Sequence, residues 1–162
     1  MIYRFTLLAI LASSTTVRAQ ALDDPLPPAA VARLGTARFK HIPGWYVHRA
    51  IYSPDGKRIA SASRGGGEVI LWDAATGKEL ARCGSVVAGH AHALAFSPDG
   101  AVLAIGKNKA IILVDTATFK VLHTLKGHAA EVQALRFVDG GKTLISAGGE
   151  GLVACTDGAT CK

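Results

Sequence analysis

The chain has 162 residues, of which 49% are hydrophobic and 6% aromatic. It contains 18 basic residues (Lys and Arg) and 12 acidic residues (Asp and Glu). The net charge of +6 is scattered along the chain, and no run of Lys and Arg alternates with aromatic residues. The electrostatic footprint of a nucleic-acid-binding protein is therefore missing, and no nucleic-acid partner is expected.

Residues 1–21 have the three parts of a secretory signal peptide: a charged start, the apolar run Phe5–Ala12, and small residues two apart before a cleavage site. Cleavage is expected after Ala21 or after Ala19, which predicts an exported protein, periplasmic or secreted. The apolar run is shorter than the ~20 residues that span a bilayer, so no membrane span is expected. The alternative is a buried N-terminal strand or helix.

Residues 22–33 contain a Pro-rich stretch and are expected to form an extended linker. The remainder, 34–162, is expected to form one repeat array. Its predicted units are residues 34–83, which include a leading outer strand at Leu34–Lys40, then residues 84–125, and finally residues 126–162, which lack an outer strand of their own.

An aspartate recurs in the array at Asp73, Asp115 and Asp157, so the period is 42 residues. A Thr follows each aspartate by three residues and a Lys by five. Ahead of each aspartate comes a turn sequence, Ser-Pro-Asp-Gly at 53–56 and 97–100 and Val-Asp-Gly-Gly at 138–141. The aspartates are interpreted as residues that close the turn after a strand.

Short apolar runs with β-branched residues flank these turns and predict an antiparallel meander in each unit. Helices are excluded because Pro54, Pro98 and the glycine clusters would break them. The predicted strands are Val47–Tyr52, Arg58–Ala62, Val69–Trp72, Glu79–Cys83, Ala93–Phe96, Val102–Ile105, Ala110–Val114, Val121–Leu125, Val132–Phe137, Thr143–Ser146 and Leu152–Cys155.

Together, Phe-Ser-Pro-Asp-Gly, a strand ending in Trp72-Asp73 and the following Thr-Gly-Lys resemble the WD-repeat β-propeller family, over roughly residues 34–162. The motifs are most complete in the first unit. The expected fold is all-β, a WD-repeat β-propeller fragment of about three four-stranded antiparallel blades. The chain resembles a short, truncated, exported member of bacterial type.

The resemblance implies a hydrogen-bonded set that locks each blade, formed by a His, a Ser or Thr, an acid and a Trp. Carried over, the set is incomplete in every unit. The first offers His41, Ser61 or Ser63, and Trp72, but has Gly or Arg64 at the acid's position. The second has Val87, Ala104, Asn108 and Val114, and the third has His128, Ser146 and Glu150 without a Trp.

Three blades form an open arc unless the chain oligomerises, because propellers of this kind close with about four to eight blades. Two explanations stay open. The chain forms a homodimer that completes a six-bladed ring, or it is a truncated relic of a longer protein with no independent function.

Catalytic chemistry is not expected, and neither is a cofactor or a metal. His90 and His92 share a face if they lie on a strand, which would make half of a metal site, but a solvated loop before the strand is preferred. The three cysteines, Cys83, Cys155 and Cys161, allow one disulfide and a free thiol, or three free thiols.

The resemblance therefore implies a non-catalytic scaffold that binds a protein or peptide through its loops. Trp45, a large aromatic in a Pro-Gly loop, is the candidate contact, although it also fits as cover for the edge of the first blade. The other loops expected to dock a partner are Ile42–Trp45, Arg64–Gly67, Val86–His92 and Gly148–Gly151. A further alternative is that the array is the propeller portion of a larger enzyme or sensor.

Overall fold

The computed structural model describes Phe39, His41 and residues 46–64, 67–83, 90–156 and 160–161. The signal peptide and linker predicted over residues 1–33 lie outside this part of the chain, as does most of the predicted leading strand. Phe39 is the one described residue of that strand, and it lies in a bend with φ at 61° rather than in an extended conformation. The chain divides after Thr36, and the described residues belong to the second unit, Ala37–Lys162.

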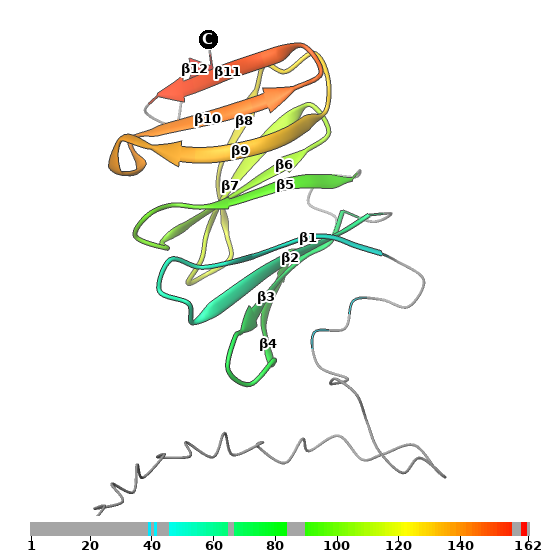
Figure 1. Cartoon of the computed structure of the whole chain (residues 1–162), viewed down its shortest axis with the longest axis vertical. Helices are drawn as coiled ribbons and strands as arrows, with labels where there is room; N and C mark the ends of the chain where they lie inside the picture. The colour runs from blue at the N-terminus through cyan, green and yellow to red at the C-terminus, as the bar shows by residue number, and fades with distance from the viewer. Residues whose placement is uncertain are drawn as a thin grey trace, which may run out of the picture. The chain divides into compact units, whose positions relative to one another are not determined.

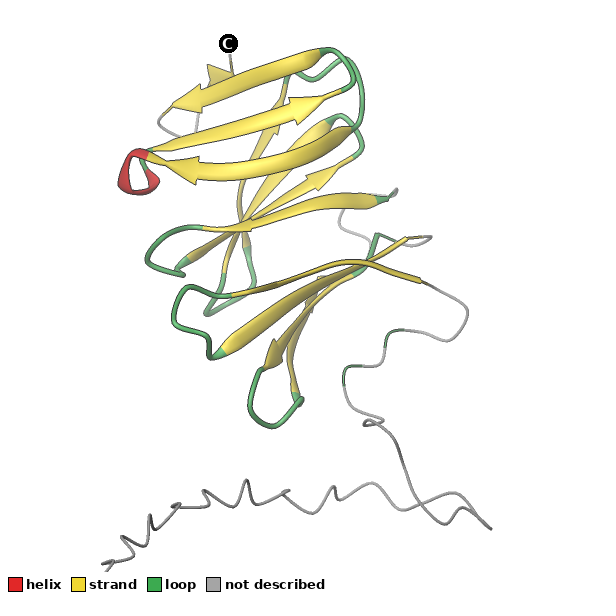
Figure 2. Ribbon diagram, in the orientation of Figure 1, coloured by secondary structure: helices red, strands yellow, loops and turns green. Residues whose placement is uncertain are grey.

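Three four-stranded antiparallel sheets, called blades 1 to 3 below, make up the described fold, and each strand pairs with the next along the chain (Figure 1, Figure 2). Blade 1 is formed by β1 (Tyr46–Tyr52), β2 (Arg58–Arg64), β3 (Val69–Asp73) and β4 (Glu79–Cys83). Blade 2 is formed by β5 (Ala91–Phe96), β6 (Val102–Lys107), β7 (Ala110–Asp115) and β8 (Val121–Lys126). Blade 3 is formed by β9 (Val132–Val138), β10 (Thr143–Gly148), β11 (Gly151–Thr156) and β12 (Thr160–Cys161).

The all-β class is confirmed, and each strand predicted from Val47 onward is present with ends within two residues of the prediction. The expectation that the third unit lacks an outer strand is wrong. Two residues, Thr160 and Cys161, pair with Thr156 and Cys155 and form the short β12. Two residues offer too little apolar sequence for a strand to be predicted.

The Ser-Pro-Asp-Gly turns use their side chains as the sequence predicts. Ser53 Oγ donates to Asp55 Oδ1 at 2.6 Å and accepts from the Arg58 amide at 2.9 Å, while Gly56 takes a φ of 70°. The turn at Ser97 repeats this geometry. Blade 3 has Val138 in place of the serine, and its turn contains the 3₁₀ helix η1 (Asp139–Gly141).

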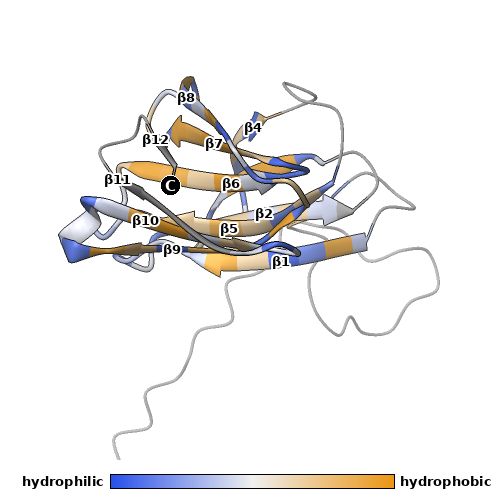
Figure 3. Ribbon diagram, turned by 90° about the horizontal axis from the view of Figure 1, so that it is seen from above, coloured by the Kyte–Doolittle hydropathy of each residue, from blue (hydrophilic) through white to orange (hydrophobic). Residues whose placement is uncertain are grey.

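The hydrophobic core lies between the blades. One cluster joins blade 1 residues such as Leu71 to blade 2 residues such as Ile105, and a second joins Leu113 on blade 2 to Leu144 on blade 3. Blade 2 therefore buries both of its faces, and Figure 3 shows β6 and β7 as mostly hydrophobic. Each blade stabilises its neighbour, as in other repeat arrays.

The inner strands β1, β5 and β9 contact one another in sequence and form what is called the inner edge of the blades below (Figure 1). Gly106 permits the close approach of blades 2 and 3, because a Cβ atom there would lie 2.8 Å from Val132 Cγ1. Two polar contacts join blades 1 and 2: Arg58 donates to the Thr116 carbonyl at 3.2 Å, and buried Lys107 donates to the Gly67 carbonyl at 3.1 Å.

Candidate functional site

A buried hydrogen-bonded cluster ties β2 to β3 in blade 1. Ser61 Oγ accepts from Trp72 Nε1 at 2.7 Å and shares a second hydrogen bond of 2.7 Å with His41 Nε2. The other imidazole nitrogen, His41 Nδ1, lies 3.4 Å from Glu68 Oε2. Glu68 is 7% exposed and supplies the acid that the sequence analysis did not find. Glu68 therefore lies where the blade 1 set needs its acid, at ion-pair distance from His41, although no hydrogen bond joins His41 Nδ1 to Glu68 Oε2.

Glu68 was missed because its turn is longer than the corresponding turn of blade 3. Ser61 pairs with Ile70, nine residues on, whereas Ser146 pairs with Val153, seven residues on. The two additional residues move the acid beyond the position at which the spacing predicts it. An acidic residue directly before the apolar run Val69–Trp72 was the available signal.

Charge around this cluster is balanced by Arg82 on β4, which pairs with both Glu68 and Glu79. The hydrogen bond from Arg82 lowers the pKa of Glu79, and the two carboxylates raise the pKa of Arg82. Burial lowers the pKa of His41, and the Glu68 carboxylate opposes that effect only in part. His41 therefore favours its neutral form in the folded chain.

The structure also brings together the His, Ser and acid of blade 3. His128 Nε2 and Ser146 Oγ lie 2.6 Å apart, and His128 Nδ1 contacts Glu150 Oε1. Glu150 Oε2 accepts from the Ala130 amide at 3.0 Å, which ties the turn between β10 and β11 to the segment before β9.

Blade 2 replaces this set with apolar side chains at the described positions. Ala104 and Val114 are both fully buried, and Val87 lies outside the described residues. Asn108 is in the turn between β6 and β7 with φ at 52°, and its carbonyl accepts from the Val132 amide at 2.7 Å. Its backbone therefore joins blade 2 to blade 3.

Asp73 and Asp115 close the turns that follow β3 and β7. Asp73 Oδ1 accepts from the amide of Thr76 at 2.7 Å and from its hydroxyl at 2.6 Å, and Asp115 makes the same two contacts with Thr118. These contacts explain why a Thr follows Asp73 and Asp115 by three residues. The hydroxyl bonds lower the pKa of both carboxyls. Asp157 lies outside the described residues.

Each inner strand carries a β-bulge at the same repeat position. The register of β1 skips His48, that of β5 skips His92, and that of β9 skips Gln133. These three residues are equivalent by alignment, since Tyr52, Phe96 and Phe137 each follow them by four. A bulge leaves one residue unpaired and re-aims its side chain, and bulges are frequent beside functional sites.

A pocket of about 300 Å³ at the inner edge is lined by these three side chains together with Arg49 and Glu131. The rings of His48 and His92 meet edge to face with centroids 5.3 Å apart, and His92 Nε2 lies 3.4 Å from Glu131 Oε2. The preferred placement of His92 in a solvated loop is wrong, because it belongs to β5 and its side chain is 14% exposed. His90 lies just before β5, with its ring 5.8 Å from that of His92.

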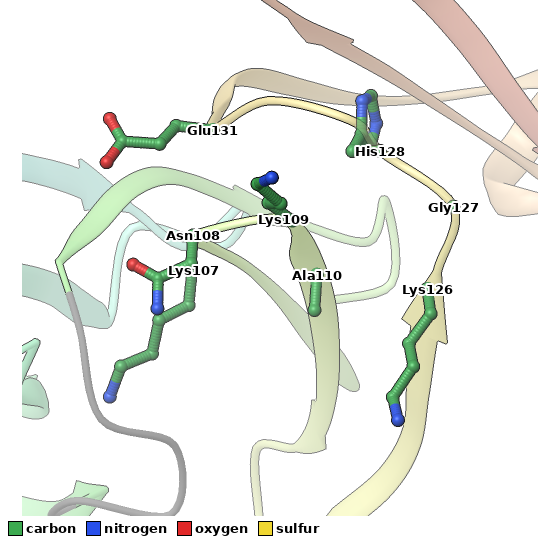
Figure 4. Close-up of a pocket in the computed structure, with 8 residues that line it drawn as sticks. All are labelled: Lys107, Asn108, Lys109, Ala110, Lys126, Gly127, His128 and Glu131. Carbon is green, nitrogen blue, oxygen red and sulfur yellow. The ribbon is translucent and has the colours of Figure 1, made fainter.

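A larger pocket, of about 570 Å³, lies between the turn after β6 and the segment before β9. It is lined by Lys107, Lys109, Lys126 and His128, among others. Figure 4 shows that the three lysine side chains point in different directions. Lys107 Nζ already donates a hydrogen bond to the Gly67 carbonyl. The lysines therefore do not form one anion site.

Trp45 and the whole of the predicted loop Ile42–Trp45 lie outside the described residues, so the predicted contact is not placed by the structure. Of the loops expected to bind a partner, only that at Gly148–Gly151 is described throughout. Cys83 is a half-buried free thiol, and Cys155 and Cys161 are register partners on β11 and β12.

The described residues contain no group of three or more His, Cys, Asp or Glu side chains arranged to hold a metal ion. Within the same part of the chain, no helix has the length and apolar character needed to cross a membrane.

Comparison with protein families matches residues 119–158 to the model described as WD domain, G-beta repeat. The match begins two residues before β8 and extends past the last residue of β11. It includes Gly127, His128, Ser146 and Glu150, rather than the first unit, whose turn motifs look more complete. A search of curated protein sequences found no match.

Solved structures with the same fold include the WD40 repeats of RRP9, with a TM-score of 0.66 and 24% identity over 72% of this chain. U3-55K is similar at a TM-score of 0.65 and 24% identity over 72% of this chain. Kuenenia stuttgartiensis hydrazine synthase is similar at a TM-score of 0.65 and 22% identity over 78% of this chain. The chain spans 37%, 38% and 36% of the lengths of these three solved chains.

Proposed function

We propose that this chain, which carries a WD40 repeat and has the WD40 β-propeller fold, is a non-catalytic scaffold that binds a protein or peptide at the inner edge of its blades. The observation that carries the proposal is the recurrence of a bulge at His48, His92 and Gln133. Repetition of a local irregularity in three strands places three polar side chains along one edge, on a rigid core. Recognition residues are commonly held in this way by a packed scaffold.

Site-specific photo-crosslinking tests this proposal. A photoreactive phenylalanine at Gln133 is expected to crosslink a partner protein in the native host. The same residue at Thr124, which is exposed on β8 and keeps its register opposite Ile112, serves as the matched control. Equal crosslinking from both positions, or none from Gln133, would overturn the proposal.

A second candidate function is supported by the similarity to hydrazine synthase, an enzyme by its name, of which this chain spans 36%. In that case the blades are the propeller portion of an enzyme and position other parts of it. A purified full-length protein that turns over a substrate, with activity lost on deletion of residues 37–162, would favour this candidate over a stand-alone scaffold.

We also propose export of the chain, because residues 1–21 have the composition and order of a signal peptide. Mass spectrometry of the protein recovered outside the cytoplasm is expected to find an N-terminus just after Ala21 or Ala19. An intact Met1 in the cytoplasmic fraction would contradict it.

A further inference from the structure

Each seam between two blades joins two faces that recur along the chain. The trailing face of a blade packs against the next blade, and the leading face packs against the preceding one. On the trailing side, Ile51 and Ala60 are register partners in blade 1, and both pack in the cluster shared with blade 2. Ala95 and Ala104 are the register partners at the same position of blade 2, in the cluster shared with blade 3. This pair of positions therefore marks the trailing face.

Blade 3 is the last described blade, and its trailing pair is open. The register partners at this position are Arg136 on β9 and Ile145 on β10. Arg136 is exposed and Ile145 is only half-buried, whereas Ala60 and Ala104, at the position of Ile145, are fully buried. The trailing face of blade 3 therefore presents an apolar side chain that a following blade would cover, with a guanidinium group beside it.

Blade 1 is the first described blade, and its leading face is open on the inner strands. Phe96 of blade 2 and Phe137 of blade 3 each lie opposite a buried leucine, and each packs against the cluster shared with the preceding blade. Tyr52 is the equivalent residue of blade 1, and its register partner is Ile59. Tyr52 is 66% exposed, because no described blade precedes it.

The open part of this leading face is confined to β1 and β2. Trp72 on β3 is the register partner of Ile59, and the rings of Phe39 and His41 lie 5.5 Å and 6.0 Å from its own. Trp72 is therefore covered, whereas Tyr52 lies beyond this cover. The inner strands of consecutive blades contact one another in the described fold, so a docking blade would meet Tyr52 with its own inner strand.

The side chains of the two open faces are complementary. In each seam within the chain, an aliphatic side chain of the trailing face and a phenylalanine of the leading face belong to one cluster. The open faces carry Arg136 and Tyr52 at these two positions. A guanidinium group is attracted to the face of a tyrosine ring. Both side chains also keep a polar group for water while the faces are apart, which suits a seam that forms between separate chains.

We propose that two copies of this chain associate head to tail, with the trailing face of blade 3 of each copy docked on the leading face of blade 1 of the other. Arg136 and Ile145 then meet Tyr52 and Ile59 in each of two identical seams. Two copies of three blades give six, which lies within the range of about four to eight at which propellers close. Head-to-tail contacts of this kind form a ring when the rotation closes. The inference goes beyond the proposed scaffold function and requires no partner of another kind.

Sedimentation equilibrium of the purified chain tests the inference, and the expected mass is twice that of the chain. Tyr52→Arg places a second guanidinium against Arg136 in both seams and is expected to weaken dimerisation about a hundredfold. Thr124→Arg is the matched control, because it adds the same charge at an exposed position of β8, outside both faces. The control is expected to dimerise as the wild-type chain does.

A mixing experiment tests the head-to-tail arrangement itself. Arg136→Glu removes the cation from the trailing face and is expected to weaken dimerisation on its own. An equimolar mixture of the Tyr52→Arg and Arg136→Glu chains is expected to dimerise again. One seam of the mixed dimer has the wild-type pair, and the other joins the introduced arginine to the introduced glutamate. Circular dichroism spectra and thermal unfolding of each variant control for correct folding.

A wild-type chain that stays monomeric at every concentration would overturn the proposal. Equal effects of Tyr52→Arg and Thr124→Arg would also overturn it, since general repulsion between basic chains would then explain the loss. A mixture of the two variants that stays monomeric would exclude the head-to-tail seam. Assemblies larger than a dimer that persist in Tyr52→Arg would show that other surfaces join the chains, and the proposal would fail.

Discussion

Replacement of Ser61 by alanine removes the centre of the blade 1 cluster. Its hydroxyl is the hydrogen-bond partner of Trp72 Nε1 and of His41 Nε2, and both rings lie in a buried environment. A buried polar group that loses its partner costs about 1–3 kcal/mol, so two such groups predict a loss of about 2–6 kcal/mol in the free energy of unfolding. Urea denaturation, followed by tryptophan fluorescence, measures this loss.

Ser63→Ala is the matched control, because Ser63 lies two residues along the same strand and is fully buried. Its hydroxyl makes one long hydrogen bond, 3.4 Å, to the Glu68 carbonyl, and that carbonyl also accepts from the Ser63 amide at 3.0 Å. The control is expected to lose at most about 1 kcal/mol. A loss in Ser63→Ala equal to that in Ser61→Ala would refute the assignment of Ser61 as the organising residue.

Three further outcomes are expected. Gly106→Ala should lower the free energy of unfolding by about 1–3 kcal/mol because its Cβ meets Val132, and Val132→Ala in the same chain should restore part of it in urea denaturation. Lys107→Met should raise the unfolding temperature at pH 7 and leave it unchanged at pH 11. Burial lowers the pKa of Lys107, so below about pH 10.5 the unfolded state takes up a proton more readily than the folded state does. The wild-type chain therefore loses stability as the pH falls through this range, and the variant does not. The lowered pKa of His41 predicts that stability falls as pH drops below about 6.5, and His41→Gln should reduce that slope between pH 6.5 and 5; an unchanged slope would contradict it.

The strands could be predicted because their signals are local. Turn residues such as Ser53 and Asp55 act within five positions of the chain, and the short apolar runs between successive turns mark the strands. The repeat of Asp73 and Asp115 was visible for the same reason, since each aspartate bonds its own turn.

The inner-edge pocket could not be predicted, because it depends on register. A bulge changes the direction in which the side chains of His48, His92 and Gln133 point, and the residue types at these positions do not predict a bulge. Glu68 was missed because the acid of the blade 1 cluster is fixed by the three-dimensional path of a longer turn. Both omissions concern side chains that meet across strands, where sequence spacing carries little information.

Hydrogen–deuterium exchange of the partner complex isolated by crosslinking at Gln133 tests the central claim most directly. Slower exchange is expected in residues 46–50, 90–94 and 131–135, which surround the bulges of β1, β5 and β9, while the outer strands β4 and β8 exchange as in the free protein. Slower exchange on β4 and β8, with the inner strands unchanged, would contradict the account.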